Sequence, residues 1–239
     1  DFTDVNNDAT RVEVNTISAE MAKVRDYVPD YAVMAHRGST FWAPEETESA
    51  WRWAREMGAD YLESDLQCTK DGVILANHDD NLKRTTNIEN VYSELVPATR
   101  KAFYMRHGMS EAEAEKLVAA DKASFRPYYA MSYMYEELLA LDAGSWFNET
   151  SIEQARESFS EQHQYISALE DQIRYAEGKM LARDADGERI YTVTGTWNPD
   201  KPRDCLTYKF EYVDDPQDTG HRPGVYIEFK ESWLNPSDF

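Results

Sequence analysis

The sequence predicts an α/β fold with parallel strands, on the basis of its element order and its composition. A short apolar segment at residues 31–38, typical of a strand, is followed by a helix pattern at residues 44–58 and a second strand pattern at residues 59–67. A strand–helix–strand order of this kind favours parallel pairing. Hydrophobic residues make up 41% of the 239 residues and aromatic residues 13%, which is enough for a substantial core.

The first helix is predicted by the signals at its two ends. Pro44 opens the segment, acidic residues follow in the first turn, and Gly58 closes it. The apolar residues between these ends recur at helical spacing, at Ala50, Trp51, Ala54 and Met57. This stripe gives the helix one apolar face.

The rest of the chain is predicted to continue the same domain with two excursions. A Lys-Asp-Gly turn separates the second strand from a third at residues 73–79. Further elements are two helices and three strands, with the helices at 111–123 and 165–179, two strands of a hairpin within 189–224, and a last strand at 224–232. We therefore predict a polar leader at residues 1–30 and one domain at residues 31–239, with insertions at about 87–135 and 181–222.

The charge of the chain excludes two classes of partner. Acidic residues number 45 and basic residues 25, a formal net charge of −20. Such a surface repels nucleic acid and anionic membranes, and no apolar run reaches the roughly 20 residues that span a bilayer. The polar opening of the chain does not read as a signal peptide, and the compartment stays open, with a periplasmic or secreted location favoured over the cytoplasm. An anionic substrate would need a local positive centre, such as a metal ion.

Two carboxylates stand out in the second predicted strand. Glu63 and Asp65 are two residues apart, so their side chains point to the same face. Carboxylates this close repel each other unless a cation lies between them. The alternative is a polar edge strand whose acids are both in water.

Further polar residues fall where other strands are predicted to end. His36, His78 and Glu228 occupy such positions, with Arg37 and Lys230 at the same level. Three carboxylates can hold a hard divalent ion, and histidines can act as general acid and base, so this set suits the hydrolysis of a phosphodiester. The alternatives are that Arg37 pairs with a carboxylate and that Lys230 is an ordinary strand-end lysine. The other histidines, His107, His163 and His221, are interpreted as surface residues.

Seven motifs in order resemble the glycerophosphodiester phosphodiesterase family, across roughly residues 31–231. They are HRG at 36–38, PEET at 44–47, GADYLESD at 58–65, TKDG at 69–72, HDDNLKRTT at 78–86, LDAGSWF at 141–147 and YIEFK at 226–230. The resemblance implies a TIM-type (β/α)8 barrel with insertions. It also implies a small-molecule substrate, a glycerophosphodiester hydrolysed to an alcohol and sn-glycerol 3-phosphate.

The resemblance also implies roles for individual residues. His36 and His78 would be the acid and the base, and Arg37 and Lys230 would contact the phosphate. Calcium or magnesium would be held by Glu63, Asp65 and Glu228. The family's mechanism is in-line attack by the neighbouring glycerol hydroxyl, which gives a cyclic phosphate that water then opens.

The chain departs from the family pattern in three ways. The family usually shows PENT where this chain has PEET, so Glu46 stands in place of an asparagine and could add a negative charge that moves specificity. The two insertions are longer than the family minimum and are expected to cover or narrow the pocket. The recognisable strands account only for the first part of a barrel, which is therefore expected to be incomplete at its C-terminal end. Two alternatives stay open, a related lipid-headgroup phosphodiesterase resembling sphingomyelinase D and a barrel that binds without turnover.

Overall fold

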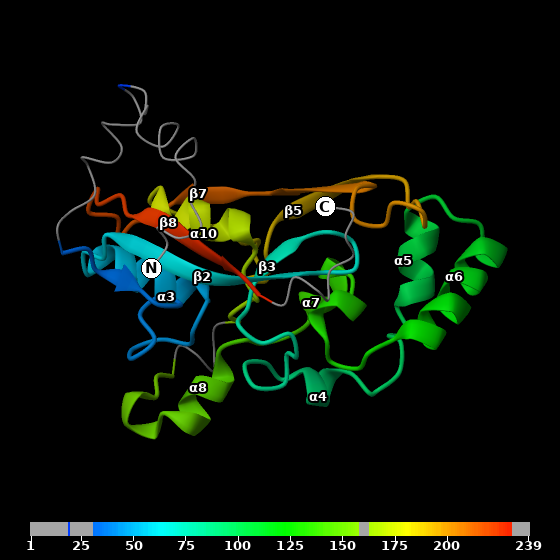
Figure 1. Cartoon of the computed structure of the whole chain (residues 1–239), viewed down its shortest axis with the longest axis horizontal. Helices are drawn as coiled ribbons and strands as arrows, with labels where there is room; N and C mark the ends of the chain where they lie inside the picture. Colours follow the sequence, from blue (N-terminus) through cyan, green and yellow to red (C-terminus); the bar gives the residue numbers. More distant parts are fainter. Residues whose placement is uncertain (1–18, 20–30, 158–162, 231–239) are drawn as a thin grey trace, which may run out of the picture. The chain divides into compact units, whose positions relative to one another are not determined.

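The computed structural model describes residue 19, residues 31–157 and residues 163–230. The chain separates into two units, Asp1–Val33 and Met34–Phe239. Every helix and strand named below belongs to the second unit (Figure 1). The leader predicted at residues 1–30 lies outside the described residues except for residue 19, and so do the last two residues of the strand predicted at 224–232.

Strand β2 (Tyr61–Cys68) is the centre of the main sheet. Strands β1 (Met34–Ala35) and β8 (Gly224–Phe229) pair with it in parallel, and β3 (Ile74–Ala76) pairs with it antiparallel. The predicted parallel strand–helix–strand unit is thus confirmed, and Figure 1 shows β8 lying alongside β2. Within the described residues this sheet has four strands and does not close. An open sheet of this kind agrees with the prediction of an incomplete α/β barrel.

The direction of β3 follows from the short connection that precedes it. A parallel pairing needs a crossover of a dozen or more residues, and only residues 69–73 lie between β2 and β3. The turn is closed by a hydrogen bond from Thr69 Oγ1 to Asp71 Oδ1 at 2.6 Å and by Gly72 at a φ of 91°. The hairpin carries the chain back along β2, so that the N–H of Asn77 donates to the carbonyl of Asp65 at 2.8 Å.

Helices α3 (Glu48–Glu56) and α10 (Leu169–Ala176) pack against each other and against β2. Both are shorter than the predicted segments, and the N-cap residue of each, Thr47 and Ala168, has extended backbone. Thr47 is the N-cap of α3, and its Oγ1 accepts a hydrogen bond from the N–H of Ala50 at 3.4 Å. The core that these elements share includes four fully buried or nearly fully buried side chains, those of Trp51, Ala54, Leu62 and Tyr175.

The segment predicted as the first insertion is helical. It holds α4 (Ile88–Val91), α5 (Arg100–Arg106), α6 (Glu111–Ser124) and the 3-10 turn η2 (Ala130–Ser132). The predicted helix at 111–123 is confirmed as α6, which begins with a capping box between Ser110 and Glu113. Three further short elements follow it, namely α7 (Tyr135–Leu138), α8 (Ser145–Thr150) and η3 (Ile152–Gln154).

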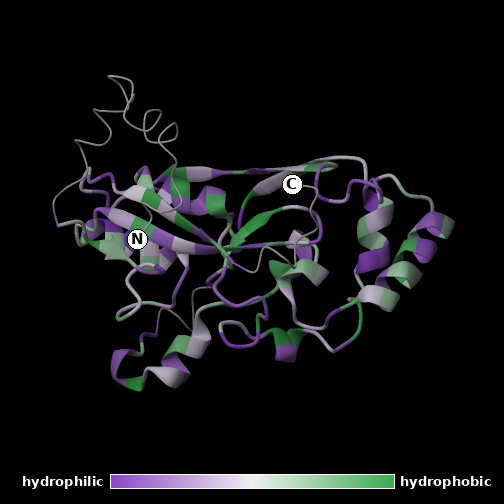
Figure 2. Cartoon of the chain, in the orientation of Figure 1, coloured by the Kyte–Doolittle hydropathy of each residue, from purple (hydrophilic) through white to green (hydrophobic). Residues whose placement is uncertain are grey.

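One histidine of this segment corrects the sequence interpretation. His107 follows α5 and is buried, with its ring 4.6 Å from that of Phe103, so the prediction of a surface residue is wrong. The burial of His107 could not be predicted from the sequence, because α5 and α6 mix hydrophilic and hydrophobic residues (Figure 2). Their shared apolar cluster also includes Trp197, which comes from the second excursion.

The second excursion consists of two antiparallel pairs. Strands β5 (Tyr191–Gly195) and β6 (Leu206–Phe210) form the predicted hairpin, and β4 (Lys179–Leu181) pairs with β7 (Tyr212–Asp214). In the described residues, no helix has the length and the apolar character needed to cross a membrane.

Candidate active site

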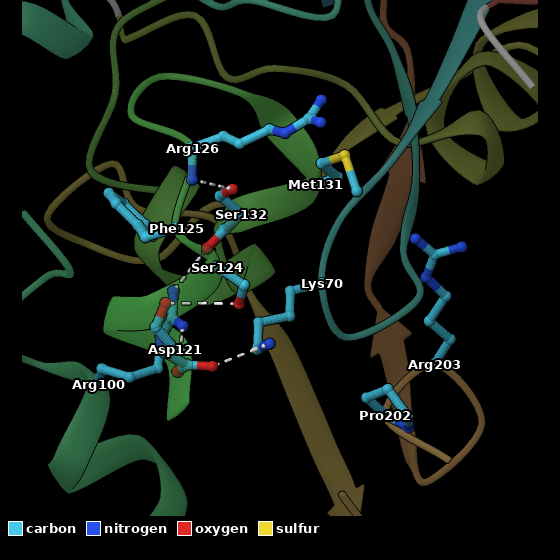
Figure 3. A pocket seen from close by; sticks show the side chains of 10 residues that line it. All are labelled: Lys70, Arg100, Asp121, Ser124, Phe125, Arg126, Met131, Ser132, Pro202 and Arg203. Atoms are coloured by element: carbon cyan, nitrogen blue, oxygen red, sulfur yellow. Dashed lines mark hydrogen bonds and ion pairs between the residues drawn. The ribbon is translucent and has the colours of Figure 1, made fainter. Parts of the chain in front are cut away.

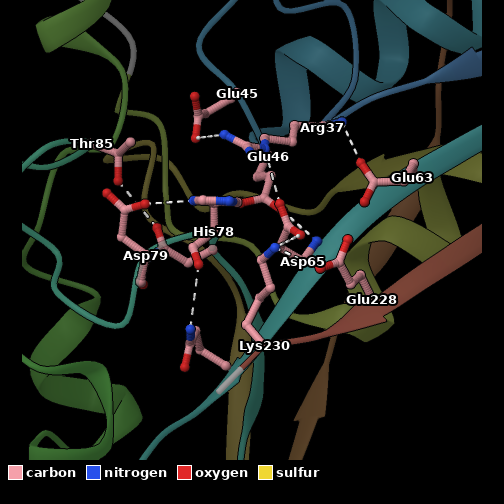
Figure 4. Close-up of polar contacts among 12 residues, drawn as sticks. Arg37, Glu45, Glu46, Glu63, Asp65, His78, Asp79, Thr85, Glu228 and Lys230 are labelled. Atoms are coloured by element: carbon pink, nitrogen blue, oxygen red, sulfur yellow. Dashed lines mark hydrogen bonds and ion pairs between the residues drawn. The ribbon is translucent and has the colours of Figure 1, made fainter. Parts of the chain in front are cut away.

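The predicted site residues gather along one stretch of β2 and its neighbours (Figure 4). Arg37 follows the end of β1, while Glu63 and Asp65 lie within β2. Lys230 directly follows β8. His78 lies two residues beyond β3, and the hairpin returns it to the level of Asp65 even though β3 runs antiparallel to the other strands.

The two carboxylates of β2 are buried and face positive groups. Oε2 of Glu63 accepts a hydrogen bond from the backbone N–H of Arg37 at 2.8 Å. Oδ2 of Asp65 lies 2.9 Å from Nε of Arg37, and Oδ1 lies 3.4 Å from Nζ of Lys230. Burial raises the pKa of Glu63, and the neighbouring Asp65 raises it further, against opposing effects of Arg37 and His36.

Three of these side chains come close enough together to hold one ion. One ligand atom from each of His36, Glu63 and Asp65 lies within 4.8 Å of the others. Both carboxylate oxygens of Asp65 are buried and accept no hydrogen bond, so within the described residues only the cations of Arg37 and Lys230 neutralise them. An oxygen-rich set with under-satisfied carboxylate atoms fits a hard divalent cation.

Glu228 is placed differently from the other two predicted metal ligands. The strand register sets it beside Asp65, but its side chain is half exposed and binds Nζ of Lys230 at 2.6 Å. This contact lowers the pKa of Glu228. Among the described residues, the close group therefore contains His36 and not Glu228. Of the three predicted metal ligands, Glu63 and Asp65 lie in this close group and Glu228 does not, while His36 was predicted to move protons.

Arg37 is held by carboxylates on two sides. Besides Asp65, its guanidinium contacts Oε1 of Glu45 at 3.3 Å. Its backbone lies at a φ of 56°, a left-handed conformation that is uncommon outside glycine. The alternative that Arg37 pairs with a carboxylate describes the contacts seen here, and its predicted contact with phosphate stays a prediction.

His78 is oriented by a chain of charged groups that the sequence analysis missed. Nδ1 of His78 lies 2.6 Å from Oδ1 of Asp79. Nε of Arg84 binds Oδ2 of Asp79 at 2.6 Å, and its two terminal nitrogens bind Glu45 at 2.7 and 3.0 Å. Burial opposes the ionisation of Asp79, but the hydrogen bonds from Arg84 and His78 outweigh it and lower its pKa. Asp79 and Arg84 both lie within the HDDNLKRTT motif, which was the available signal.

Glu46, the departure from the PENT pattern, is buried beneath the carboxylates. Its Oε1 accepts a hydrogen bond from the backbone N–H of Asp65 at 2.7 Å, while its Oε2 is buried without a hydrogen-bond partner. Burial raises the pKa of Glu46 well above its ordinary value, and the nearby Asp65 and Glu45 raise it further. Burial thus opposes the negative charge that Glu46 could add at this position.

Comparisons with known proteins agree on one family. The sequence model of the glycerophosphoryl diester phosphodiesterase family matches residues 36–202. A glycerophosphodiester phosphodiesterase from Bacillus subtilis (strain 168) is 31% identical over 126 residues, which are 53% of this chain and 30% of that protein. A glycerophosphoinositol inositolphosphodiesterase from Mus musculus is 28% identical over 160 residues, 64% of this chain and 24% of that protein.

Two solved structures match about two thirds of the chain at lower similarity. A glycerophosphodiester phosphodiesterase from Agrobacterium tumefaciens str. C58 is 25% identical with a TM-score of 0.36, and the match covers 62% of this chain and 42% of that one. An Oleispira antarctica phosphodiesterase, solved with the product sn-glycerol-3-phosphate, is 23% identical with a TM-score of 0.38, over 66% and 44% of the two chains. The chain thus spans less than a third of each of these two curated relatives and less than half of each of these solved chains.

Proposed function

The chain belongs to the glycerophosphoryl diester phosphodiesterase family, and from that membership we propose that it hydrolyses glycerophosphodiesters to an alcohol and sn-glycerol 3-phosphate. The observation that carries the proposal is the meeting of His36, Glu63 and Asp65 within 4.8 Å on the strand that also faces His78. A buried pair of carboxylates can bind a metal ion, two imidazoles can transfer protons, and two cations can bind a phosphate. Metal-assisted hydrolysis of a phosphodiester requires groups of these kinds.

Glu63 and Asp65 are proposed to hold a Ca²⁺ or Mg²⁺ ion, with Glu228 beside them in the strand register. The bound ion would polarise a non-bridging phosphoryl oxygen. In this site Arg37 and Lys230 neutralise the carboxylates. A phosphate bound beside them would meet the same two cations, which supports their assignment to substrate binding.

His36 and His78 are proposed to move protons on opposite sides of phosphorus. One accepts the proton of the glycerol hydroxyl as its oxygen bonds to phosphorus, and the other protonates the departing alcohol oxygen as its bond to phosphorus breaks. The cyclic phosphate is then opened by water with the two roles reversed. Asp79 favours this use of His78 because it holds Nδ1 and leaves Nε2 for the substrate.

The proposal is tested by the release of glycerol 3-phosphate from glycerophosphocholine and glycerophosphoethanolamine. The chain is assayed with EDTA and then with added Ca²⁺ or Mg²⁺, beside the His78→Ala variant. His221→Ala is the matched control, because this half-buried imidazole lies outside the site and contacts the carbonyl of Ala59. We expect turnover that metal restores and that only the His78 variant loses, by about 100-fold or more.

Two results would contradict the proposal. One is full turnover in EDTA or in a folded His78→Ala variant. The other is a wild-type chain that unfolds cooperatively in urea and binds the metal, yet releases no glycerol 3-phosphate from either substrate. The second result would favour the binding module without turnover.

A further inference from the structure

A cavity with several charged side chains in its lining lies outside the candidate active site (Figure 3). It has a volume of about 230 Å³ and is lined by three separate parts of the chain. These are the turn after β2 at Lys70, the α5–α6–η2 segment, and the loop before β6 at Arg203. None of its ten lining residues belongs to the predicted catalytic or metal-binding set.

Two of the lining residues, Arg100 and Asp121, belong to a network of ion pairs. The fully buried Arg100 binds Oδ2 of Asp121 at 2.7 Å and both oxygens of Glu137 at 2.8 and 2.7 Å. Oδ1 of Asp121 binds Nζ of Lys70 at 2.9 Å, and its Oδ2 also accepts the hydroxyl of Tyr104 at 2.7 Å. Asp121 is therefore neutralised from several sides, and its charge offers little repulsion to an incoming anion.

The charges that line the cavity are mainly positive. Four basic residues line the cavity, namely Lys70, Arg100, Arg126 and Arg203, and Asp121 is the one acidic lining residue. Glu137 is outside the lining and binds Arg100. Arg203 has further interactions of its own, and the other five side chains leave one positive charge in excess, in a chain whose formal net charge is −20. A concentration of cations in so acidic a chain would focus the local field on a small anion.

Lys70 and Arg126 both have hydrogen-bond donors that could bind an anion. An ammonium group has three donors, and Lys70 Nζ is engaged by one carboxylate, that of Asp121. The exposed guanidinium of Arg126 stacks over the ring of Tyr129 at 5.8 Å and has no carboxylate partner within the described part of the chain. Figure 3 shows Arg126 and Arg203 apart from each other across the cavity.

We propose that this cavity binds a small phosphate-bearing anion, either inorganic phosphate or a short phosphate monoester. The spare donors of Lys70 and Arg126 match phosphate oxygens, and the excess of positive charge at the cavity favours an anion. The volume is below the ~300 Å³ of ordinary ligand pockets, which limits the occupant to a few heavy atoms beyond phosphate. The site is independent of the proposed enzymatic activity.

Isothermal titration of the full chain with inorganic phosphate tests this site. EDTA is present and ionic strength is held constant with chloride, so that neither a bound metal nor simple screening produces the signal. Arg126→Gln and Lys70→Gln are expected to weaken phosphate binding about tenfold or more, the loss for one charge-assisted hydrogen bond. Lys209→Gln is the matched control, since it removes one positive charge from a side chain that is 74% exposed and lies outside the cavity. It is expected to change affinity less than twofold.

The same titration separates the cavity from the active site. Lys230→Gln removes a cation from the active site and is expected to leave phosphate binding to the cavity unchanged. A repeat with sn-glycerol 3-phosphate on the wild type and the two cavity variants shows whether the cavity takes a monoester, because only the binding that the cavity variants weaken belongs to the cavity. The proposal is overturned if wild-type chain gives no phosphate heat, if both cavity variants bind like wild type, or if Lys230→Gln alone abolishes binding.

Discussion

The side chain of Glu46 holds the backbone of Asp65, through a hydrogen bond of 2.7 Å from the Asp65 N–H to Oε1. This bond ties the loop after β1 to the strand that carries both buried carboxylates. Glu46 sits at a φ of 55°, where asparagine is favoured among non-glycine residues. An uncharged glutamic acid resembles an amide in shape, with one acceptor and one donor. Its raised pKa therefore explains how the chain keeps a glutamate where the PENT pattern has asparagine.

Replacing Glu46 by glutamine is expected to remove a pH dependence of stability. Burial raises the folded-state pKa of Glu46, so above the unfolded pKa of about 4.3 we expect the native chain to keep a proton that the unfolded chain loses. The free energy of unfolding then falls as pH rises through this window, with a slope that approaches about 1.4 kcal/mol per pH unit for one proton. Glu46→Gln cannot ionise and is expected to be the more stable variant at neutral pH.

Urea unfolding between pH 4 and pH 8 measures this difference. The two proteins should be close in stability at pH 4 and should diverge as pH rises. Parallel curves for the wild type and Glu46→Gln would mean that Glu46 is ionised in the folded chain.

Asp65→Asn is expected to abolish stabilisation by divalent metal. An ion that binds only the folded chain raises its stability by about 2.7 kcal/mol at 100 times its dissociation constant, which shifts the melting temperature by several degrees. Asp65 contributes two buried carboxylate oxygens that face Arg37 and Lys230, so its replacement removes a ligand of the proposed ion. Asp214→Asn is the control, since that carboxylate is 89% exposed and pairs with Lys179. The measurement is the melting temperature with Ca²⁺, Mg²⁺ or EDTA. An equal rise in melting temperature on adding metal to both variants would exclude Asp65 as a ligand.

Arg84→Gln is expected to lower turnover while barely changing stability. Arg84 is 42% exposed, so its ion pairs add at most about 1 kcal/mol to folding. Its bonds to Asp79 nevertheless hold the carboxylate that orients His78. We expect kcat to fall about tenfold and the pH profile of kcat to move, with little change in KM. Lys83→Gln, a neighbouring exposed cation paired with Glu89, should have neither effect. An unshifted profile at normal kcat would show that Asp79 holds His78 without Arg84.

Gly72→Ala is expected to destabilise the β2–β3 hairpin by more than the strain of its backbone alone. A Cβ at this position would lie 2.2 Å from the carbonyl oxygen of Arg203, and the φ of 91° is already unfavourable for alanine. Gly187→Ala is a matched control, because its φ is 83° and nothing lies within 4 Å of the added Cβ. The control should lose about 1–3 kcal/mol from strain, and Gly72→Ala should lose more in the same urea titration. Equal losses would mean that the loop at Arg203 moves aside freely.

The local features of this protein follow from its amino-acid sequence alone. Alternation along a strand placed Glu63 and Asp65 on one face, and end signals located α3 to within a few residues. The helix predicted at 111–123 agrees with α6 to within one residue. The order of the motifs along the chain indicates the family without any structural information. These features depend on residues close together in the chain, whose spacing alone sets which side chains share a face.

The contacts between residues far apart in the chain depend on the tertiary fold. The antiparallel hairpin that brings His78 level with Asp65 and the burial of Glu46 against the N–H of Asp65 both depend on pairing across the sheet. The cationic cavity joins Lys70 to Arg126, from segments that no sequence pattern connects. Such contacts form because the whole core excludes water and sets the distance between charges, and no local spacing encodes that free energy.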